Sequence, residues 1–311
     1  MSFTSLKNLP LKESLAPGHR LCDGCGIPHV VRYALKAVDD HSVVIVNATG
    51  CLEVCTTPYP YTSWRVPYVH TLFGNTGAVA SGIVETIEKL SSEKRSQYFD
   101  VIVFAGDGGT FDIGLQALSG ALERGHDFLY ICYDNEAYMN TGNQRSSATP
   151  MYSRTTTSYA GKAIPGKLER KKDIIGIVVA HGIKYAATAS ISHWRDYMTK
   201  VRKGVEVKGP AFIHVLQPCQ TGWRYDPALT IKMAKMAVDA NVFPLIEVEK
   251  GKYKITYRPP KKILVADYLK PQRRFAHLFL PENDHLIRQI QQYVDQNWER
   301  LNKLEKFSET G

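Results

Sequence analysis

Two apolar runs that each end in polar residues, with a helical pattern between them, place the strongest constraint on the fold of this chain. Residues 101–105 lead into Asp107 within the sequence GDG, and residues 128–133 lead into an Asp-Asn pair that ends at Asn135. The segment between them repeats leucine at helical spacing. In a parallel α/β unit both strand ends lie at the carboxyl edge of the sheet, where ligands bind. We therefore expect a ligand site that includes Asp107 and Asn135.

The same alternation of strand and helix runs through most of the chain. Apolar runs that predict strands lie at 42–48, 100–105, 128–133, 183–189 and 211–216. Helical patterns lie between and around them, at 27–38, 76–94, 113–124, 171–180, 192–204 and 229–240. Strands that alternate with helices favour an α/β fold with a doubly wound, mostly parallel sheet.

Changes in composition at both ends of the chain indicate three parts. Residues 1–20 are polar and contain proline, so we expect an N-terminal arm outside the core. Residues 21–245 form the main domain. Residues 246–311 form a C-terminal extension with a hairpin, a Pro-Lys linker and a polar helix at 283–306. Apolar positions in that helix are sparse, and we expect it to pack on a partner subunit or lie on the surface.

Charge and cysteine content limit the possible classes of function. The 311 residues carry a net charge of +9 and include six cysteines. There is no signal-like N-terminus and no apolar run of about eighteen residues, which predicts a soluble, cytoplasmic protein that does not enter a membrane. Cysteines in that setting argue against a disulfide framework. The basic residues are scattered, which argues against nucleic acid; a basic surface also suits an acidic electron carrier or a plain solvated face.

Asp107 and Asn135 carry oxygen atoms suited to a hard cation. A carboxylate, an amide oxygen and a backbone carbonyl near Ala137, together with phosphate oxygens, make a ligand set that Mg²⁺ prefers. Neighbouring glycines let the backbone approach a phosphate group, which the following helix N-terminus also favours. These glycines are Gly106, Gly108 and Gly109. Gly-Asp-Gly alone is also an ordinary turn, but its spacing to Asp-Asn across one helix favours a magnesium-diphosphate clamp.

Four cysteines lie where they can share one inorganic centre. Cys22 and Cys25 form a CxxC before the first helix, and Cys51 and Cys219 each follow a predicted strand. A thioredoxin-like redox pair normally follows a strand, and none precedes this CxxC. Four thiolates bind zinc or a 4Fe-4S cluster, and the spacing does not choose between the two.

The other two cysteines have simpler interpretations. Cys132 lies inside an apolar run and is expected to be a small core residue. Cys55 follows Cys51 by one helical turn, and it is either a spare ligand or a buried thiol.

Six segments of the chain resemble the β subunits of the 2-oxoacid:ferredoxin oxidoreductases, and most closely those of the pyruvate type. The resemblance covers roughly residues 15–275. The segments are APGHRLCDGCG at 16–26, NATGCLEV at 47–54, TPYPYTSWRVPY at 57–68, GDGG to DNEAYMNTG within 106–142, GNQRSSATP at 142–150 and PCQTGWR at 218–224.

The resemblance implies a sheet of the thiamine-diphosphate-binding type and three cofactors, which are thiamine diphosphate, Mg²⁺ and one 4Fe-4S cluster. The implied cluster ligands are Cys22, Cys25, Cys51 and Cys219. The implied cofactor-binding residues are Thr49, Gly50, Gly106, Asp107, Gly108, Gly109, Asn135, Ala137, Asn140 and Thr141. Magnesium is implied to bind to Asp107, Asn135 and the Ala137 carbonyl. Asn140 is the implied catalytic residue, placed to hydrogen-bond the substrate or intermediate at the reacting carbon.

The implied reaction is the reversible oxidative decarboxylation of pyruvate with coenzyme A to acetyl-CoA and CO₂, with electrons passed through the cluster to ferredoxin. No glutamate in this chain is placed to activate the aminopyrimidine ring of the cofactor, since Glu53 follows the loop that carries Cys51 and Glu136 lies in the metal loop, residues 134–142. In the family that glutamate, and the arginine that holds the substrate carboxylate, belong to an α-type subunit. The resemblance therefore implies a hetero-oligomer, with further γ- or δ-type subunits, and a chain that is inactive alone.

Three alternatives stay open. The Gly74-Asn75 pair lacks the acidic residue of the family's Phe-Glu-Asn pattern, so the substrate can also be oxalate, a branched-chain 2-oxoacid or 2-oxoglutarate. A cluster-free thiamine decarboxylase or synthase fits the clamp but not the four cysteines, and such enzymes usually carry Asn-Asn after GDG. A zinc-stabilised binding module with a basic surface fits the cysteines but gives the clamp no role.

Overall fold

The computed structural model describes residues 3 and 5–310. Its centre is one eight-stranded sheet in the order β2-β1-β3-β4-β6-β5-β7-β8. The first six strands of that order run parallel, and the last two form an antiparallel hairpin. The strands are β1 Val43–Ala48, β2 Tyr68–Thr71, β3 Asp100–Gly106, β4 Phe128–Asp134, β5 Tyr185–Ser190, β6 Ala211–Leu216, β7 Ile246–Glu249 and β8 Lys252–Ile255. The predicted α/β fold with a mostly parallel sheet is confirmed.

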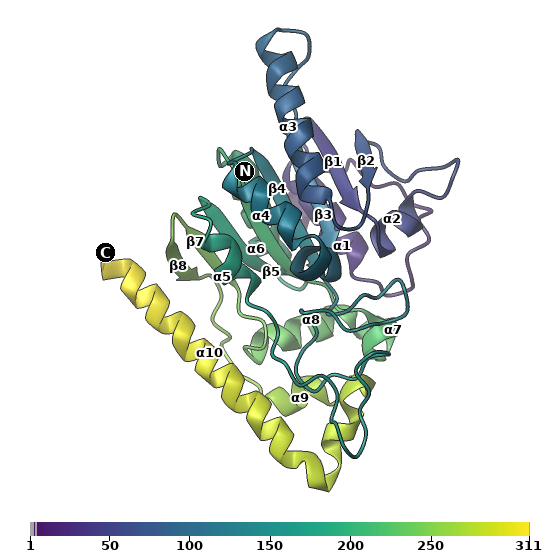
Figure 1. Ribbon diagram of the computed structural model, residues 1–311, viewed down its shortest axis with the longest axis vertical. Coiled ribbons are helices and arrows are strands. Elements are labelled where there is room, and N and C mark those ends of the chain that lie inside the picture. Colours follow the sequence, from purple (N-terminus) through teal and green to yellow (C-terminus); the bar gives the residue numbers. More distant parts are fainter. Residues whose placement is uncertain (1–2, 4, 311) are drawn as a thin grey trace.

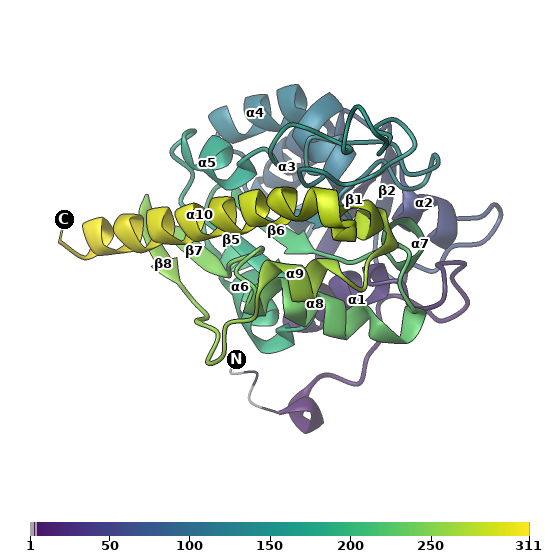
Figure 2. The same ribbon diagram turned by 90° about the horizontal axis from the view of Figure 1, so that it is seen from below.

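Helices cover both faces of the sheet (Figure 1). On one face lie α1 (Ile27–Ala37) and α6 (Trp194–Glu206), and on the other lie α3 (Thr76–Ser92), α4 (Leu115–Glu123) and α5 (Ile174–Val179). Figure 2 shows the two layers on opposite sides of the strands. In the part of the chain that the structure describes, no helix combines the length and the apolar character needed to cross a membrane.

β4 shows why the central strands are continuous apolar runs in the sequence. All of its residues are buried. Leu129 and Ile131 pack in the cluster that includes α1 and α6, whereas Tyr130 and Cys132 pack in the cluster that includes α3 and α4. A parallel strand that is covered on both faces needs apolar side chains at successive positions. Cys132 is fully buried, which confirms its prediction as a core residue.

The sequence patterns miss several short elements near the carboxyl edge, among them β2 and α2. β2 is an edge strand in which only Thr71 is buried, so it lacks an apolar run. α2 (Cys51–Thr56) is too short to show a helical period. The start of one predicted helix also differs, because Gly108–Ile113 form a π-helical turn and α4 begins only at Leu115.

The C-terminal part packs on this chain itself. β7 pairs with β5, so the hairpin extends the main sheet. Next come α9 (Val265–Leu269) and α10 (Asp284–Thr310), the long helix that runs past β8 in Figure 1. We expected this helix to pack on a partner subunit or to lie on the surface. The first expectation is wrong for the apolar face of the helix, because that face packs on this chain. Four of its apolar side chains are buried against this chain, namely Leu286, Ile290, Val294 and Leu301.

The remaining described elements are short or lie near the ends of strands. Two helices precede the hairpin, α7 (Gln220–Trp223) and α8 (Thr230–Asp239). Short 3₁₀ turns lie at Leu6–Asn8, Pro227–Leu229, Arg273–Phe279 and Pro281–Asn283. The N-terminal segment is not wholly outside the core, because Leu15 is fully buried and forms an antiparallel bridge with Trp64.

Candidate functional site

The carboxyl ends of β3 and β4 bring the two predicted metal residues together. The strands are neighbours, with Gly106 beside Tyr133. Asp107 and Asn135 lie just beyond this pair, and both are buried. The side-chain amide oxygen of Asn135 lies 3.2 Å from an Asp107 carboxylate oxygen and 2.8 Å from the Ala137 carbonyl oxygen. Three oxygen atoms therefore face one another in a buried space.

Three facing oxygen atoms repel one another unless a hydrogen or a cation lies among them. If the Asn135 amide is turned by 180°, its N–H groups donate to both neighbours. A cation would instead stabilise the orientation in which the Asn135 oxygen faces the other two oxygens. Mg²⁺ binds oxygens at about 2.0–2.1 Å and so places neighbouring ligands about 2.9 Å apart in an octahedron. The donor types and their spacing fit Mg²⁺, the cation that the sequence predicts.

A network of buried charges surrounds these oxygens. Burial and the neighbouring Asp134 carboxylate raise the pKa of Asp107 well above its ordinary value, and a hydrogen bond from the Ser146 hydroxyl opposes the shift. Burial acts to raise the pKa of Asp134 too, but Lys171 and His214 outweigh it and lower that pKa to about 2. Lys171 Nζ and His214 Nε2 lie 2.5 Å and 2.7 Å from the same Asp134 oxygen. A bound cation would favour the ionised form of Asp107.

The predicted phosphate glycines lie in a closely packed loop. A Cβ atom on Gly108 would lie 2.5 Å from the Tyr138 ring, and one on Gly109 would lie 3.2 Å from the Phe73 carbonyl oxygen. The Tyr138 hydroxyl also donates to the Gly108 carbonyl at 3.2 Å. Gly106 has more room, since the nearest atom would lie 3.5 Å from its Cβ. Packing against Tyr138 thus requires glycine at position 108, a constraint that the sequence spacing does not reveal.

Thr49 and Gly50 lie at the end of β1, the strand next to β3. The Thr49 hydroxyl lies 2.8 Å from His70 Nε2 and donates to the Thr71 carbonyl at 3.1 Å. A Cβ on Gly50 would lie 3.1 Å from the Tyr133 hydroxyl, which is buried and has no hydrogen-bond partner among the described residues. The β1 loop and the strand that leads to the metal loop therefore touch at this edge.

Asn140 and Thr141 lie on an exposed turn. The turn is closed by Tyr138 and Gln144, whose backbone groups exchange hydrogen bonds of 2.9 and 3.1 Å. The Gln144 side chain also donates to the Thr141 carbonyl at 2.9 Å. The structure places both residues at the surface of the single chain, and their contacts with cofactor and substrate stay predictions.

The four predicted cluster cysteines gather in one region. Cys51 begins α2, and Cys219 caps α7, where its sulfur accepts a hydrogen bond from the Gly222 N–H at 3.5 Å. Burial raises the pKa of Cys25, and negative charge on Cys219, Cys51 and Cys22 acts in the same direction. Burial, followed by the Cys219 charge, raises the pKa of Cys51 to about 12. Hydrogen bonds join the segments that carry these cysteines, because the Arg20 N–H donates to the Cys55 carbonyl at 2.9 Å and the Thr230 hydroxyl donates to the Gly24 carbonyl at 2.5 Å.

A fifth thiol, Cys55, belongs to the same region, because burial and then the Cys22 charge raise its pKa. All six cysteines are free. Within residues 3 and 5–310, no three His, Cys, Asp or Glu side chains converge as the ligands of one metal ion. Four thiolates around a single zinc ion lie about 3.8 Å apart, whereas each thiolate of a 4Fe-4S cluster binds a different iron. A cluster therefore needs a wider group of thiols than zinc does.

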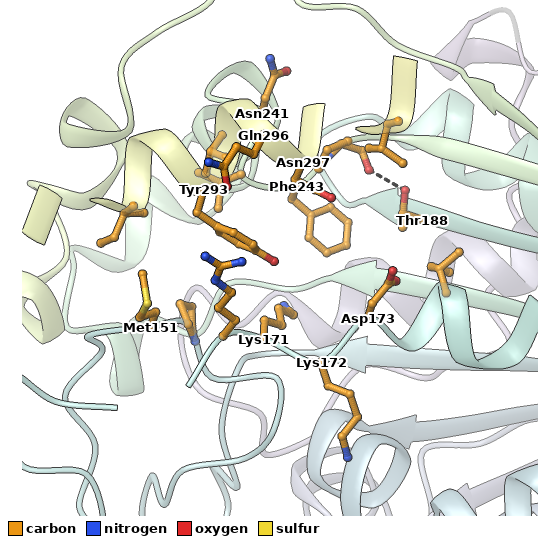
Figure 3. Close-up of a pocket in the computed structure, with 18 of the residues that line it drawn as sticks. Met151, Lys171, Lys172, Asp173, Thr188, Asn241, Phe243, Tyr293, Gln296 and Asn297 are labelled. Atoms are coloured by element: carbon orange, nitrogen blue, oxygen red, sulfur yellow. Dashed lines mark hydrogen bonds between the residues drawn. The ribbon is translucent and has the colours of Figure 1, made fainter. Parts of the chain in front are cut away.

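A cavity of about 400 Å³ lies between the metal-loop network and α10. Figure 3 shows Tyr293 of α10 and Phe243 on one side of the cavity, with Lys171 and Asp173 on the other. The Lys171 ammonium also lies 5.5 Å from the centre of the Phe243 ring. Side chains of the C-terminal helix thus line the same cavity as Glu136, Lys171 and His214 of the network. Sequence spacing gives no sign of this arrangement, since Lys171 lies in a short basic run that is typical of a solvated surface.

Comparison with known proteins defines the class first. Residues 48–215 match the family model described as the C-terminal TPP binding domain of thiamine pyrophosphate enzymes. The chain also superposes on the 2-oxoglutarate:ferredoxin oxidoreductase from Magnetococcus marinus, solved with 2-oxoglutarate, coenzyme A and succinyl-CoA bound. That match has a TM-score of 0.51, covers 73% of this chain and 78% of that chain, and has 20% identity. The fold is therefore that of a thiamine-diphosphate-binding domain.

Curated relatives narrow the class to one family. The pyruvate synthase subunit PorB of Methanocaldococcus jannaschii is 54% identical over 296 residues, which cover 94% of this chain and 97% of that protein. The PorB subunit of Thermotoga maritima is 46% identical over 300 residues, covering 94% and 93%. The ketoisovalerate oxidoreductase subunit VorB of Pyrococcus abyssi is 45% identical over 299 residues, covering 95% and 94%. The chain belongs to the β subunits of the 2-oxoacid:ferredoxin oxidoreductases, as its motifs predict.

Proposed function

We propose that this chain is the β subunit of a pyruvate:ferredoxin oxidoreductase. The enzyme converts pyruvate and coenzyme A reversibly to acetyl-CoA and CO₂, and passes electrons through a 4Fe-4S cluster to ferredoxin. Five relatives that are named pyruvate synthase subunits, at 45–54% identity, support the substrate. The observation that carries the proposal is the buried group formed by the Asp107 carboxylate, the Asn135 side-chain amide and the Ala137 carbonyl, because these donor types suit a magnesium ion at the diphosphate of the cofactor.

The residues of this chain would hold and orient the cofactor. Thiamine diphosphate, when bound, supplies the nucleophilic carbon and the electron sink for decarboxylation. Asp107, Asn135 and the Ala137 carbonyl would bind Mg²⁺, and the Ser146 hydroxyl would orient the Asp107 carboxylate through its hydrogen bond. The remaining proposed contacts of the cofactor are Thr49, Gly50, Gly106, Gly108, Gly109, Asn140 and Thr141. Asn140 would donate a hydrogen bond to the substrate.

The cysteine group would hold the electron-transfer centre. Cys22, Cys25, Cys51 and Cys219 are the proposed ligands of one 4Fe-4S cluster, supported by the pKa of Cys25, which burial raises together with the charges of the other three cysteines. Iron–sulfur clusters reach the low potentials that ferredoxin reduction requires. A reducing compartment would keep the cysteines available as thiolates for iron, so we place the enzyme in the cytoplasm.

The other proposed partner is an α-type subunit that supplies the activating glutamate and the substrate-binding arginine. Glu136, which lies closest to the metal oxygens in sequence, is buried and bonded to Lys171 and Arg274, so it is not free to meet the cofactor ring. Glu53 is bonded to Thr57 through its carboxylate. Further γ- or δ-type subunits would connect the cluster with ferredoxin.

The test is to purify this chain alone and together with an α-type subunit, and to supply iron, sulfide, Mg²⁺ and thiamine diphosphate to both. We expect pyruvate- and CoA-dependent reduction of a viologen dye only when both subunits are present. Robust turnover by the chain alone would contradict the need for a partner. Turnover of a branched-chain 2-oxoacid in place of pyruvate would favour the second candidate, a ketoisovalerate oxidoreductase, which the VorB relatives support.

A further inference from the structure

A buried tryptophan contacts both the metal loop and the loop of a proposed cluster ligand. Trp223 is fully buried and ends α7, the helix capped by Cys219. Its ring N–H donates to the Asn135 backbone carbonyl at 2.8 Å. Its backbone N–H donates to the Cys219 carbonyl at 2.9 Å. Asn135 contributes one of the three converging oxygens, so a single residue connects the two ligand sets.

Arg274 contacts both the Trp223 ring and the metal loop. The guanidinium carbon lies 3.9 Å from the centre of the Trp223 ring. One guanidinium nitrogen donates to the Glu136 carboxylate at 2.6 Å, and the Nε–H donates to the Gln272 side chain at 2.9 Å. Arg274 and Glu136 are both buried. A planar guanidinium can stack on a ring and donate hydrogen bonds within its plane at the same time, which a lysine ammonium cannot do.

Glu136 has a backbone conformation that needs support. Its φ of +67° lies in the left-handed region, which is unfavourable for residues other than glycine. Its N–H donates to Asp134 Oδ1 at 2.7 Å, and its carbonyl accepts from the Thr149 hydroxyl at 2.6 Å. Lys171 and Arg274 hold its two carboxylate oxygens. This turn of the chain lies between two of the oxygen donors, so the same contacts fix where those donors point.

The metal loop and the cluster loop, which is the segment 218–223 that carries Cys219, also touch directly. A Cβ on Gly222 would lie 2.2 Å from the Met139 sulfur, and the Gly222 N–H donates to the Cys219 sulfur. Met139 therefore packs directly on Gly222, at a position where any larger side chain would clash.

We propose that Trp223 and Arg274 are positioning residues that hold the metal loop and the cluster loop in one fixed arrangement. The proposal rests on the proposed function, since it takes Asn135 as a magnesium residue and Cys219 as a cluster ligand. Residues that orient metal ligands without touching the metal commonly change its affinity. The two residues thereby set the magnesium affinity and transmit structural changes between the two cofactors.

The main test compares Trp223→Phe with the parent chain, each co-purified with its partner subunits. Phenylalanine keeps a ring that stacks on Arg274 but removes the N–H that donates to Asn135. We expect the Mg²⁺ concentration for half-maximal thiamine diphosphate binding to rise about 10- to 100-fold, with unchanged iron content and with activity restored by excess Mg²⁺. Trp64→Phe is the matched control, because Trp64 is also buried and its ring N–H donates at 3.0 Å to the Thr56 hydroxyl of α2 instead.

A second variant and a spectroscopic signal separate positioning from general destabilisation. Arg274→Lys keeps the positive charge but loses the stacking geometry, and we expect it to raise the Mg²⁺ requirement in the same direction. In the parent, we expect the electron paramagnetic resonance signal of the reduced cluster to change when Mg²⁺ and thiamine diphosphate bind, and in Trp223→Phe we expect that change to be lost.

The inference is overturned if Trp223→Phe needs no more Mg²⁺ than the parent or than Trp64→Phe. It is also overturned if the cluster signal of Trp223→Phe responds to the cofactor as the parent signal does. A parent complex that binds neither thiamine diphosphate nor iron would instead refute the proposed function itself, so the two failures are distinguishable.

Discussion

Replacing Lys171 with methionine should destabilise the chain strongly and in a pH-dependent way. The ammonium lies 2.5 Å from Asp134 and 3.2 Å from Glu136, and both carboxylates are buried. Methionine fills a similar volume but carries no charge. Glu136 keeps the charged partner Arg274, whereas Asp134 keeps the His214 ring and the Glu136 backbone N–H but no lysine or arginine. The variant therefore leaves a buried carboxylate with too little compensating charge.

The size of the effect follows from the burial of the pair. Removing one partner of a buried ion pair costs about 3–5 kcal/mol in the free energy of unfolding. Unfolding entropy is about 2.1 cal/mol/K per residue, so for a chain of 311 residues that loss lowers Tm by roughly 5–8 °C. Lys235→Met is a suitable control, because its ion pair with Asp239 lies at the surface and should contribute no more than about 1 kcal/mol.

The pH dependence distinguishes this mechanism from simple loss of packing. In the parent the pKa of Asp134 is lowered to about 2, so its contribution is present above its ordinary pKa and is lost only as the pH falls toward 2. Burial acts to lower the pKa of Lys171, but Asp134 and Glu136 raise it above its ordinary value, so its contribution is lost only at strongly alkaline pH. Between pH 5 and pH 8 the ion pair of Lys171 and Asp134 should therefore contribute a constant amount.

In the Lys171→Met variant, burial dominates and raises the pKa of Asp134. A carboxyl group whose pKa is raised in the folded state lowers the free energy of unfolding as the pH rises. The loss of stability of the variant relative to the parent should therefore be larger at pH 8 than at pH 5. Differential scanning calorimetry of both chains at the two pH values measures the deficit. An equal deficit at both pH values, or a shift no larger than that of Lys235→Met, would refute the reasoning.

Three further predictions follow from the site and the packing. Asp107→Ala should abolish retention of thiamine diphosphate in equilibrium dialysis while the visible spectrum of the cluster stays nearly intact; unchanged retention would contradict the clamp. Cys219→Ser should lower the iron content of purified protein whereas Cys132→Ser should not, and full iron in the first variant would remove that ligand. Gly77→Ala should lower stability in urea titrations by about 1–3 kcal/mol, because its Cβ would lie 2.7 Å from a backbone carbonyl of α4. Gly82→Ala, with no atom within 4 Å, should raise it by about 0.5–1 kcal/mol, and equal effects would contradict the packing.

The adjacency of Asp107 and Asn135 could be predicted from the sequence because it follows from topology alone. Two parallel strands joined by one helix are usually neighbours, and the residues that follow them then meet at one edge. The buried central strands could also be predicted from the sequence, since a strand that is covered on both faces requires a continuous apolar run. β2 was not, because an edge strand needs no such run.

The network around the metal loop could not be predicted from spacing. Lys171 meets Asp134 and Glu136 only because a long loop returns to the sheet edge, and neither helical nor strand periodicity describes the path of a loop. The same holds for Arg274, which reaches Glu136 from the C-terminal part of the chain. The spacing of the motif likewise predicts that Gly108 lets the backbone approach a phosphate group. The structure shows a second reason for glycine at this position, because a Cβ there would clash with the Tyr138 ring.

Reciprocity between the two cofactors gives a last prediction. Trp223 connects the metal loop with the cluster loop, so a bound cluster should strengthen the binding of Mg²⁺ and thiamine diphosphate. By reciprocity, bound Mg²⁺ and thiamine diphosphate must then strengthen the binding of the cluster by the same free energy. In the parent complex, the cofactor should therefore raise the concentration of iron chelator that removes half of the iron at equilibrium. The Trp223→Phe variant should show a much smaller increase, because its metal loop no longer hydrogen-bonds to the tryptophan ring. A chelator midpoint in the parent that does not change when Mg²⁺ and thiamine diphosphate are added would show that the two sites are independent.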